Sequence, residues 1–214
     1  MAEFARPGAE QWVPDGAGVA ELRAAAPDCR GCELYRDATQ VVFGTGPERA
    51  RLMLVGEQPG DSEDRQGEPF VGPAGKLLGD ALAEAGIALD DAYVTNAVKH
   101  FRFELRGKRR IHKSPAVAHI GACNPWLEAE LRAVRPEVVV ALGATAARGV
   151  LGRTARVGAE RGRELPDRVA AASDARILLT AHPSAVLRLR GTPDFDPEFA
   201  ALVADLRTAA ALLA

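Results

Sequence analysis

Short apolar segments alternate with longer amphipathic ones along this chain. Four short segments are aliphatic or β-branched and are bounded by Gly, Asn or Pro, as is typical of buried parallel strands. They span residues 51–56, 92–96, 137–143 and 176–180. Four longer segments carry apolar residues at helical spacing. They span residues 72–86, 115–134, 144–151 and 197–213. The alternation predicts an α/β fold, namely a three-layer α/β/α sandwich with a central, mostly parallel four-stranded sheet.

Three of the predicted strands are followed by unusual loops. The loops begin with GEQPGD at residue 56, AVKHF at residue 97 and AHPS at residue 181. Loops of this length in a compact domain more often form binding surfaces than serve only to connect two elements. Ligands of open α/β sheets bind at the carboxyl ends of the strands, so we expect the functional site where these loops emerge.

Length and composition favour one domain. The chain has 214 residues, of which 47% are hydrophobic and 26% are charged, enough for one sizeable core. Residues 1–18 contain two prolines and three glycines and predict a flexible N-terminal arm, which leaves residues 19–214 as the domain. The sequence shows no apolar run of bilayer length and no targeting signal, which predicts a cytoplasmic protein that does not enter a membrane.

Positive charge is concentrated in one segment of a chain whose net charge is only −2. Residues 99–113 carry seven Lys and Arg residues against a single Glu. Such a concentration of one sign is typical of a surface that binds a polyanion such as a nucleic acid. A solvated charged loop is the alternative.

Common nucleotide-binding motifs are incomplete here. The segment GTGPER at residues 44–49 precedes the first strand and lacks the third glycine of a dinucleotide fingerprint. The segment VGPAGKL at residues 71–77 lacks the upstream glycine and the Ser or Thr of a P-loop. A generic dinucleotide-dependent dehydrogenase is therefore not expected.

Three cysteines raise the possibility of a metal site. Cys29 and Cys32 form a C-x-x-C motif, and Cys123 stands alone. An odd number without a secretory signal argues against a disulfide framework. A tetrahedral sulfur site needs a fourth ligand, for which His100 and His119 are the candidates. Spacing alone leaves open a [4Fe–4S] cluster with three Cys and one His, a Cys₃His zinc site, or three unrelated thiols.

Four ordered motifs carry a resemblance to a known family. They are GEQPGDSEDRQGEPFVGPAGKLL, VTNAVKHF, KRRIH and HPSAVLR, and they follow the C-x-x-C motif. Together they closely resemble the uracil-DNA glycosylase superfamily over residues 29–188. Within it, GEQPG and KRRIH resemble the UdgX-type branch. The related family 4 typically shows GEAPG and a fourth cysteine where this chain has Gln58 and His100, and it lacks KRRIH.

The resemblance implies an enzyme that excises uracil from DNA. We also expect single-stranded DNA among its substrates, and a monomer, since nothing in the sequence indicates an obligate dimer. The resemblance also implies a [4Fe–4S] cluster held by Cys29, Cys32, His100 and Cys123. A glycosylase must hold the extruded base and support charge separation as the glycosidic bond opens. The resemblance assigns uracil contacts to Gln58, Phe70 and Asn96, and catalytic contacts to Glu57, Asp61 and His182. Without it, Phe70 would be a core anchor, and Asn96 and His182 would be turn residues.

The KRRIH motif adds a nucleophile to this scheme. When uracil leaves, C1′ of the sugar is an electrophile, and a tethered imidazole can outcompete water for it. We therefore expect His112 to bond covalently to C1′, so that the enzyme is consumed in a single turnover. The cations Lys108, Arg109, Arg110 and Lys113 are expected to contact the DNA backbone. The alternatives are a conventional multi-turnover iron–sulfur glycosylase and a non-catalytic iron–sulfur module that binds nucleic acid.

Overall fold

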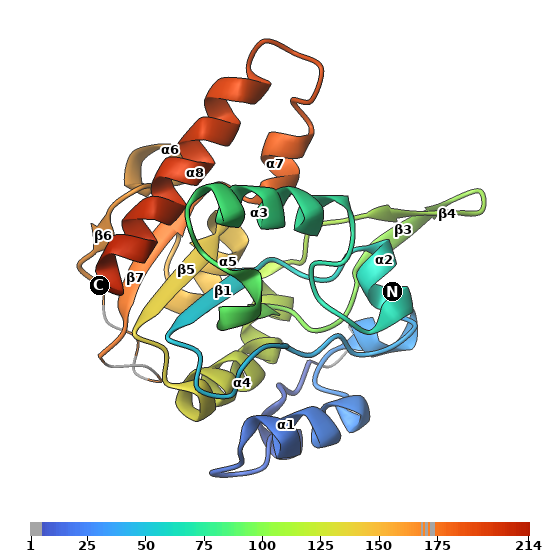
Figure 1. Ribbon diagram of the computed structural model, residues 1–214. Coiled ribbons are helices and arrows are strands. Elements are labelled where there is room, and N and C mark those ends of the chain that lie inside the picture. The colour runs from blue at the N-terminus through green and yellow to red at the C-terminus, as the bar shows by residue number, and fades with distance from the viewer. Residues whose placement is uncertain (1–5, 168, 170, 172–173) are drawn as a thin grey trace.

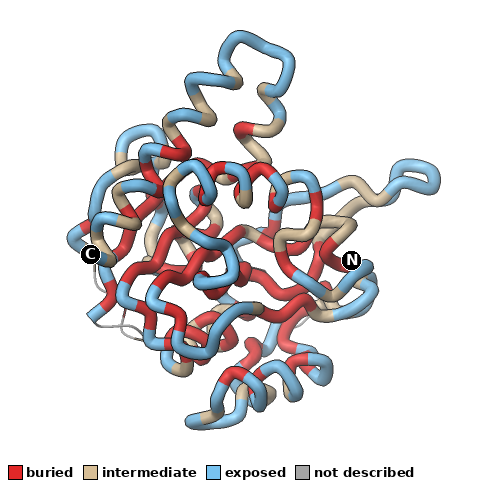
Figure 2. The backbone as a smooth tube through the Cα atoms, in the orientation of Figure 1, coloured by how far each residue is buried: buried red, intermediate tan, exposed pale blue. Residues whose placement is uncertain are grey.

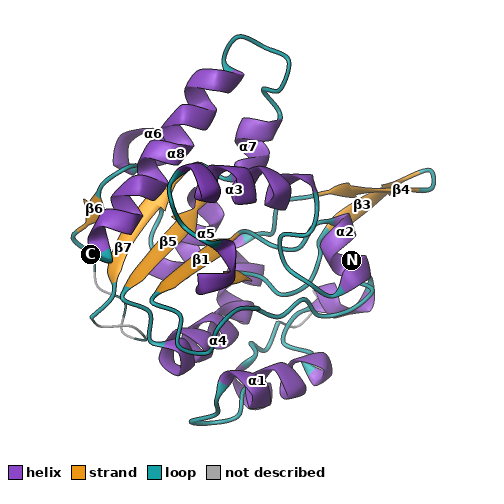
Figure 3. Ribbon diagram, in the orientation of Figure 1, coloured by secondary structure: helices purple, strands orange, loops and turns teal. Residues whose placement is uncertain are grey.

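A central sheet of five strands organises the protein (Figures 1 and 3). The computed structural model describes residues 6–167, 169, 171 and 174–214. The strand order is β2-β1-β5-β7-β6, with bounds Ala92–Asn96, Leu52–Gly56, Val138–Leu142, Arg176–Thr180 and Glu164–Leu165. The first four strands are parallel and match the predicted segments, whereas β6 is antiparallel to β7. The predicted count of four was wrong because β6 has only two residues, too few to show a pattern.

Helices cover both faces of the sheet, which confirms the three-layer prediction. On one face, α3 (Pro73–Glu84), α7 (Pro183–Leu187) and α8 (Phe195–Leu212) pack against Leu52, Leu54 and their neighbours. On the other face, α4 (Val117–Val134) and α5 (Gly143–Leu151) pack against Met53 and Val55. Alternate residues of each strand therefore face opposite cores, and the strands are buried on both sides (Figure 2).

Shorter helices lie outside the predicted segments. Besides α7, they are η1 (Glu10–Trp12), α1 (Val19–Ala25), η2 (Ala26–Asp28), η3 (Glu33–Arg36), α2 (Asp61–Gln66), η4 (Leu89–Asp91) and α6 (Val157–Glu160). The four longer predicted helices are present as α3, α4, α5 and α8. Within the described part of the chain, no helix combines the length and apolar character needed to cross a membrane.

The N-terminal segment packs against the outside of α4. Ala9 is fully buried, in a cluster with Leu22, Cys29 and Trp126. The backbone N–H of Gly8 also donates a hydrogen bond to the carbonyl of Gly31. Residues 6–18 of the predicted flexible arm therefore contact the domain, while residues 1–5 lie outside the described residues.

A β-hairpin occupies the basic segment that was predicted to be a loop. Strands β3 (Phe103–Arg106) and β4 (Arg109–His112) pair in antiparallel register, with Phe103 opposite His112. Gly107 turns the chain at a φ of 61°, a conformation that glycine adopts without steric strain. The hairpin projects from the body of the domain (Figure 1). Its base, which includes His112, lies beside the carboxyl ends of the strands.

Candidate functional site

Polar side chains from three strand ends meet at one edge of the sheet. Glu57 follows β1, Asn96 ends β2, and His182 follows β7 and caps α7. The parallel register places Gly56 opposite Asn96, so the ends of β1 and β2 lie side by side. The structure therefore brings together residues that are between 39 (Glu57 to Asn96) and 125 (Glu57 to His182) positions apart in the sequence, as the strand-end rule predicts.

Phe70, Asn96 and His182 border one side of the site. The rings of Phe70 and His182 lie 6.5 Å apart, centre to centre, with 28° between their planes. A Cβ on Gly56 would lie 2.4 Å from Asn96 Oδ1 and 2.6 Å from Phe70 Cζ. Glycine at position 56 is thus what allows the amide and the phenyl ring to approach each other. Phe70 itself has a φ of 59°, which is uncommon for an aromatic residue and is typical of functional sites.

His182 is held as a neutral hydrogen-bond donor. Burial lowers the pKa of His182 to about 4, and the cation Arg188 acts in the same direction. The backbone N–H of Ser184 donates to His182 Nδ1 at 3.1 Å. Because Nδ1 accepts, the proton of the neutral ring must be on Nε2. That N–H can donate to a developing oxyanion without a net charge on the ring.

Only one of the two carboxylate oxygens of Glu57 has a hydrogen-bond partner among the described residues. Its Oε2 accepts a hydrogen bond from Thr145 Oγ1 at 2.7 Å. Its Oε1 is buried and is one of the few buried side-chain atoms with no hydrogen-bond partner among the described residues. The Nε2 of His112 lies 3.5 Å from Oε1. An unsatisfied buried carboxylate oxygen is destabilising, so it favours a proton donor at this position.

His112 is a half-exposed imidazole at the base of the hairpin. Its ring centre is 6.0 Å from that of Phe101. Partial burial lowers the pKa of His112, and Arg188 lowers it further, against the opposing effect of Glu57. The ring is therefore neutral at physiological pH and keeps a nitrogen lone pair. A neutral imidazole facing both the solvent and a carboxylate can act as a nucleophile.

The side chain of Gln58 binds the base of the hairpin. Its side chain donates to the carbonyls of Arg102 and Lys113 at 3.1 and 3.3 Å, and it accepts from the N–H of Arg102 at 3.1 Å. These backbone groups form the base of the hairpin. The uracil contact predicted for Gln58 stays a prediction, and the side-chain amide itself is used by the hairpin.

The four cations predicted to contact the DNA backbone divide into two classes. Lys108, Arg109 and Lys113 are exposed, as a DNA-contacting surface requires. Arg110 differs from the prediction, because its guanidinium binds Asp61 and Asp64 inside the protein. Asp61 is held between Arg110 and Arg65, and these ion pairs lower its pKa although burial opposes them. Neither the Arg110 fork nor the Asp61 carboxylate is free for substrate in this arrangement.

A buried ion pair lies directly behind Asn96. Lys99 and Glu130 are 1% and 0% exposed, and their side chains pair with each other. Lys99 Nζ also donates to the carbonyl of Asn96 at 2.7 Å, and Glu130 accepts from the hydroxyls of Tyr93 and Thr95. The network fixes the end of β2 against α4.

The three cysteines are buried in one cluster beside α4. Burial raises the pKa of Cys123 to about 12 and also raises that of Cys32. Two N–H groups donate to sulfur, from Lys99 to Cys123 at 3.3 Å and from Trp126 to Cys29 at 3.2 Å. Buried thiols with N–H donors fit a thiolate-bound metal group, which would supply the positive charge that stabilises the thiolates. Over the described residues, however, no three His, Cys, Asp or Glu side chains are grouped closely enough to hold a metal ion.

The two candidate imidazole ligands have different surroundings. Both ring nitrogens of His119 are used, since Nδ1 accepts from the N–H of Ala116 and Nε2 lies 3.0 Å from Glu33. His100 is buried, and burial lowers its pKa to about 4, so it is a neutral ring. A neutral imidazole is the form that binds metals. His100 is therefore the better fourth ligand of the two.

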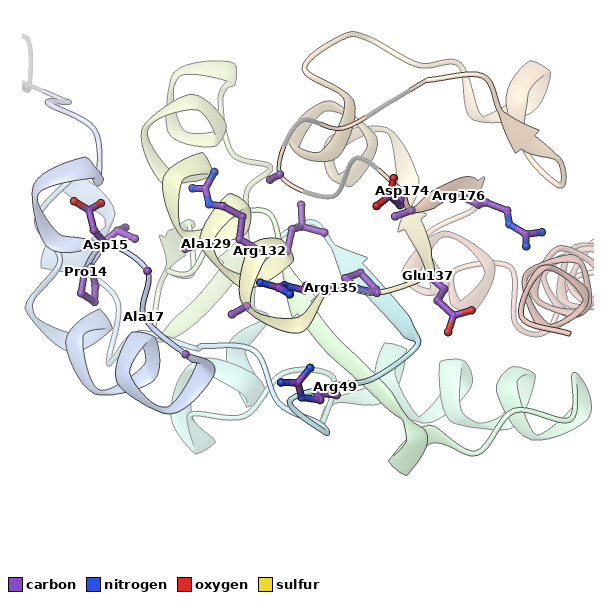
Figure 4. Close-up of a pocket in the computed structure, with 18 residues that line it drawn as sticks. Pro14, Asp15, Ala17, Arg49, Ala129, Arg132, Arg135, Glu137, Asp174 and Arg176 are labelled. Carbon is purple, nitrogen blue, oxygen red and sulfur yellow. The ribbon is translucent and has the colours of Figure 1, made fainter.

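A large cavity lies at the opposite end of the sheet. It has a volume of about 960 Å³ and is lined by Arg49, Arg132, Arg135 and Arg176, with Asp15, Glu137 and Asp174 among its acidic residues (Figure 4). Glu137 and Arg176 stand at the amino ends of β5 and β7. This cavity is thus separate from the strand-end site.

Several site residues were not predicted from the sequence. Thr145 orients Glu57, Ser184 fixes the tautomer of His182, and Arg188 affects the pKa of both histidines. Arg188 lies inside the HPSAVLR motif, so the motif pointed to it. Thr145 comes from α5, which carries no motif, and only the fold could bring it to Glu57.

Comparisons of the sequence with known proteins indicate a family. Residues 43–207 match the family model described as the uracil DNA glycosylase superfamily. The chain is 36% identical over 163 residues to a type-4 uracil-DNA glycosylase of Thermotoga maritima, covering 76% of this chain and 79% of the relative. It is 34% identical over 178 residues to one of Pyrobaculum aerophilum, covering 80% and 87%. It is 41% identical over 119 residues to one of Archaeoglobus fulgidus, covering 56% of each chain.

Proposed function

Because the chain belongs to the uracil DNA glycosylase superfamily, we propose that it excises uracil from DNA and captures the product through His112. The observation that carries the proposal is the unsatisfied Glu57 Oε1, which faces His112 Nε2 at 3.5 Å. It combines with a neutral His182 and with Asn96 at the same sheet edge. A binding module would need none of these groups in this arrangement.

The first step breaks the bond between C1′ of the sugar and N1 of uracil. Phe70 stacks on the extruded base, and the Asn96 amide pairs with O4 and N3–H. The bonding electrons leave with N1, and His182 Nε2–H stabilises the negative charge that develops on O2. The sugar is left with a positive charge centred on C1′ and its ring oxygen. Glu57, next to the sugar, stabilises that charge.

The second step forms a bond between an imidazole nitrogen of His112 and C1′. The attacking nitrogen supplies its lone pair, so the ring becomes a cation. Its remaining N–H proton passes to Glu57 and from there to the departing uracil or to solvent. An alkylated imidazole is a poor leaving group, so the product stays joined to the protein. A tethered nucleophile has an effective molarity of up to about 10⁵ M or more, which lets His112 outcompete water.

The metal group that we propose is a [4Fe–4S] cluster with Cys29, Cys32, His100 and Cys123 as ligands. Its support is the buried donor set, the N–H groups that donate to sulfur, and the neutral state of His100. When bound, the cluster supplies a structural cross-link between the N-terminal segment and α4. The ligands themselves do not touch the reacting atoms.

The remaining features of the proposal concern the setting of the reaction. The exposed cations Lys108, Arg109 and Lys113 support contact with the DNA backbone. We propose that single-stranded uracil DNA is among the substrates, because a projecting hairpin can follow an unpaired strand. A monomer in the cytoplasm is the state that we expect for this activity.

The test is a heat-stable band shift. The protein is incubated with a single-stranded oligonucleotide that contains one uracil, boiled in detergent and run on a denaturing gel; a thymine oligonucleotide is the control. We expect a covalent conjugate only with uracil, and none with the variant His112→Ser. Free abasic DNA without a conjugate would indicate a conventional glycosylase instead. Unaltered DNA would indicate a binding module.

A further inference from the structure

Arg110 is a cation of the hairpin whose side chain turns into the protein. Its side chain is only 12% exposed, whereas those of its neighbours Lys108 and Arg109 are exposed. Arg110 Nε donates to Asp61 Oδ1 at 2.5 Å, and Nη1 donates to Asp64 Oδ2 at 2.6 Å. The guanidinium therefore bridges two carboxylates of α2.

The surroundings of Arg110 hold it in one position. Asp64 is fully buried, and it also accepts from the backbone N–H of Thr39 at 3.0 Å. The guanidinium carbon lies 5.5 Å and 5.1 Å from the ring centres of Phe101 and Phe103. Arginine suits this environment because its planar fork donates in two directions and its flat face stacks on aromatic rings.

Arg110 is also well placed to affect His112. The two residues are two positions apart on β4, and alternate residues of a strand point to the same face. Their cross-strand partners are Leu105 and Phe103. Fixing the Arg110 side chain against α2 thus fixes the face of the hairpin that carries the imidazole. Gln58 holds only the backbone at the hairpin base, at Arg102 and Lys113.

We propose that Arg110, through Asp61 and Asp64, is a positioning residue that sets how often His112 rather than water reaches C1′. The inference rests on the proposed covalent capture and adds to it the residue that controls its yield. Uracil departure depends on Glu57, Asn96 and His182, which belong to the sheet edge and not to the hairpin. A loosened hairpin should therefore still allow uracil release, but more of the abasic sugar should then be attacked by water. Arg110 itself does not contact the reacting atoms.

The quantity to measure is the ratio of conjugate to free abasic product in a single-turnover reaction with uracil DNA. In Arg110→Met we expect this ratio to fall by about 10- to 100-fold, because a displacement of about 1 Å can cost 10²-fold in a positioned reaction. Arg110→Lys keeps the charge but not the two-way fork, so its ratio should lie between those of Arg110→Met and the parent protein.

The matched control is Arg109→Met, which removes the same charge from the adjacent, exposed position of the same strand. It should weaken DNA binding in a salt-dependent way while leaving the ratio unchanged. An unchanged ratio in Arg110→Met would overturn the inference. So would an equal fall in Arg109→Met, because a phosphate contact would then explain both.

Hydrogen exchange of the protein without DNA tests whether Arg110 anchors the hairpin, independently of the reaction with uracil DNA. We expect the amides of residues 103–112 to exchange faster in Arg110→Met and not in Arg109→Met. Equal exchange in both variants would refute a positioning role, whatever the DNA products. If the parent protein forms no conjugate, the proposed capture by His112 is refuted. Faster exchange of the hairpin amides in Arg110→Met would still show, in that case, that Arg110 holds the hairpin in place. These outcomes separate the two proposals.

Discussion

The substitution Lys99→Met would remove one member of the ion pair behind Asn96. Glu130 would keep its buried charge, together with the hydroxyl donors of Tyr93 and Thr95 and the N–H of Gly44. Breaking a buried pair by removing one partner typically lowers the free energy of unfolding by about 3–5 kcal/mol. Because three donors remain on Glu130, we expect the lower end, about 3 kcal/mol. At about 2–4 °C per kcal/mol for a chain of this size, Tm should fall by about 6–12 °C.

Two further variants isolate the cause of this loss. Lys99→Met combined with Glu130→Gln leaves no buried charge, and the amide can still accept from Tyr93 and Thr95, so most of the lost stability should return. Lys76→Met removes an exposed lysine from α3 and should change the free energy of unfolding by less than about 0.5 kcal/mol.

Thermal unfolding followed by circular dichroism, with the metal content of each sample measured, is the assay. The backbone N–H of Lys99 that donates to Cys123 is kept in Lys99→Met, so metal content should not fall. Lys99 also holds the Asn96 carbonyl, so the Kd for uracil DNA should rise in the single variant. A Tm loss below about 2 °C in Lys99→Met, or a double variant no more stable than the single one, would refute the assignment of the energy to an uncompensated Glu130.

Three other predictions concern the chemistry of the site. The pKa of His112 is lowered from its ordinary value of 6.5, so the midpoint at which covalent capture is lost as the ring gains a proton should lie below pH 6.5; a midpoint at neutral pH, in band shifts across a pH series, would contradict this. Thr145→Val removes the hydrogen bond to Glu57 and should slow capture by about 5- to 10-fold, from the loss of about 1 kcal/mol, while Thr154→Val is a control on an exposed threonine. Purified protein should be brown, with a visible absorption band that disappears when the cluster is oxidised. A colourless protein that contains zinc would remove the cluster from the proposal.

The sequence predicted the sheet and the place of the site because both depend on repeating patterns. Four strands are buried at every position or nearly so, and such runs are visible without a structure. The position of Glu57, Asn96 and His182 then follows from the rule that parallel strands end at one edge. The two-residue strand β6 is too short to show such a pattern. The hairpin strands do not show it either, because most of their residues are charged and few are apolar.

The sequence could not show how individual cations are used. Arg109 and Arg110 are adjacent and chemically identical, yet one is exposed and the other binds two carboxylates of α2. The difference comes from strand alternation in a hairpin that charge patterning cannot reveal. Gln58 was similarly ambiguous, because its partners are the backbone groups of residues 44 and 55 positions away.

The site therefore combines two parts with different physical supports. The sheet edge that holds Asn96 and His182 rests on two hydrophobic cores, which resist displacement because each strand residue is packed on both sides. The hairpin that holds His112 rests instead on hydrogen bonds and ion pairs from Gln58, Asp61 and Asp64. Polar supports of this kind can be weakened one at a time without unfolding the domain. Uracil release and covalent capture are consequently separable by mutation of the hairpin, since uracil release needs only the residues of the sheet edge whereas capture also needs His112.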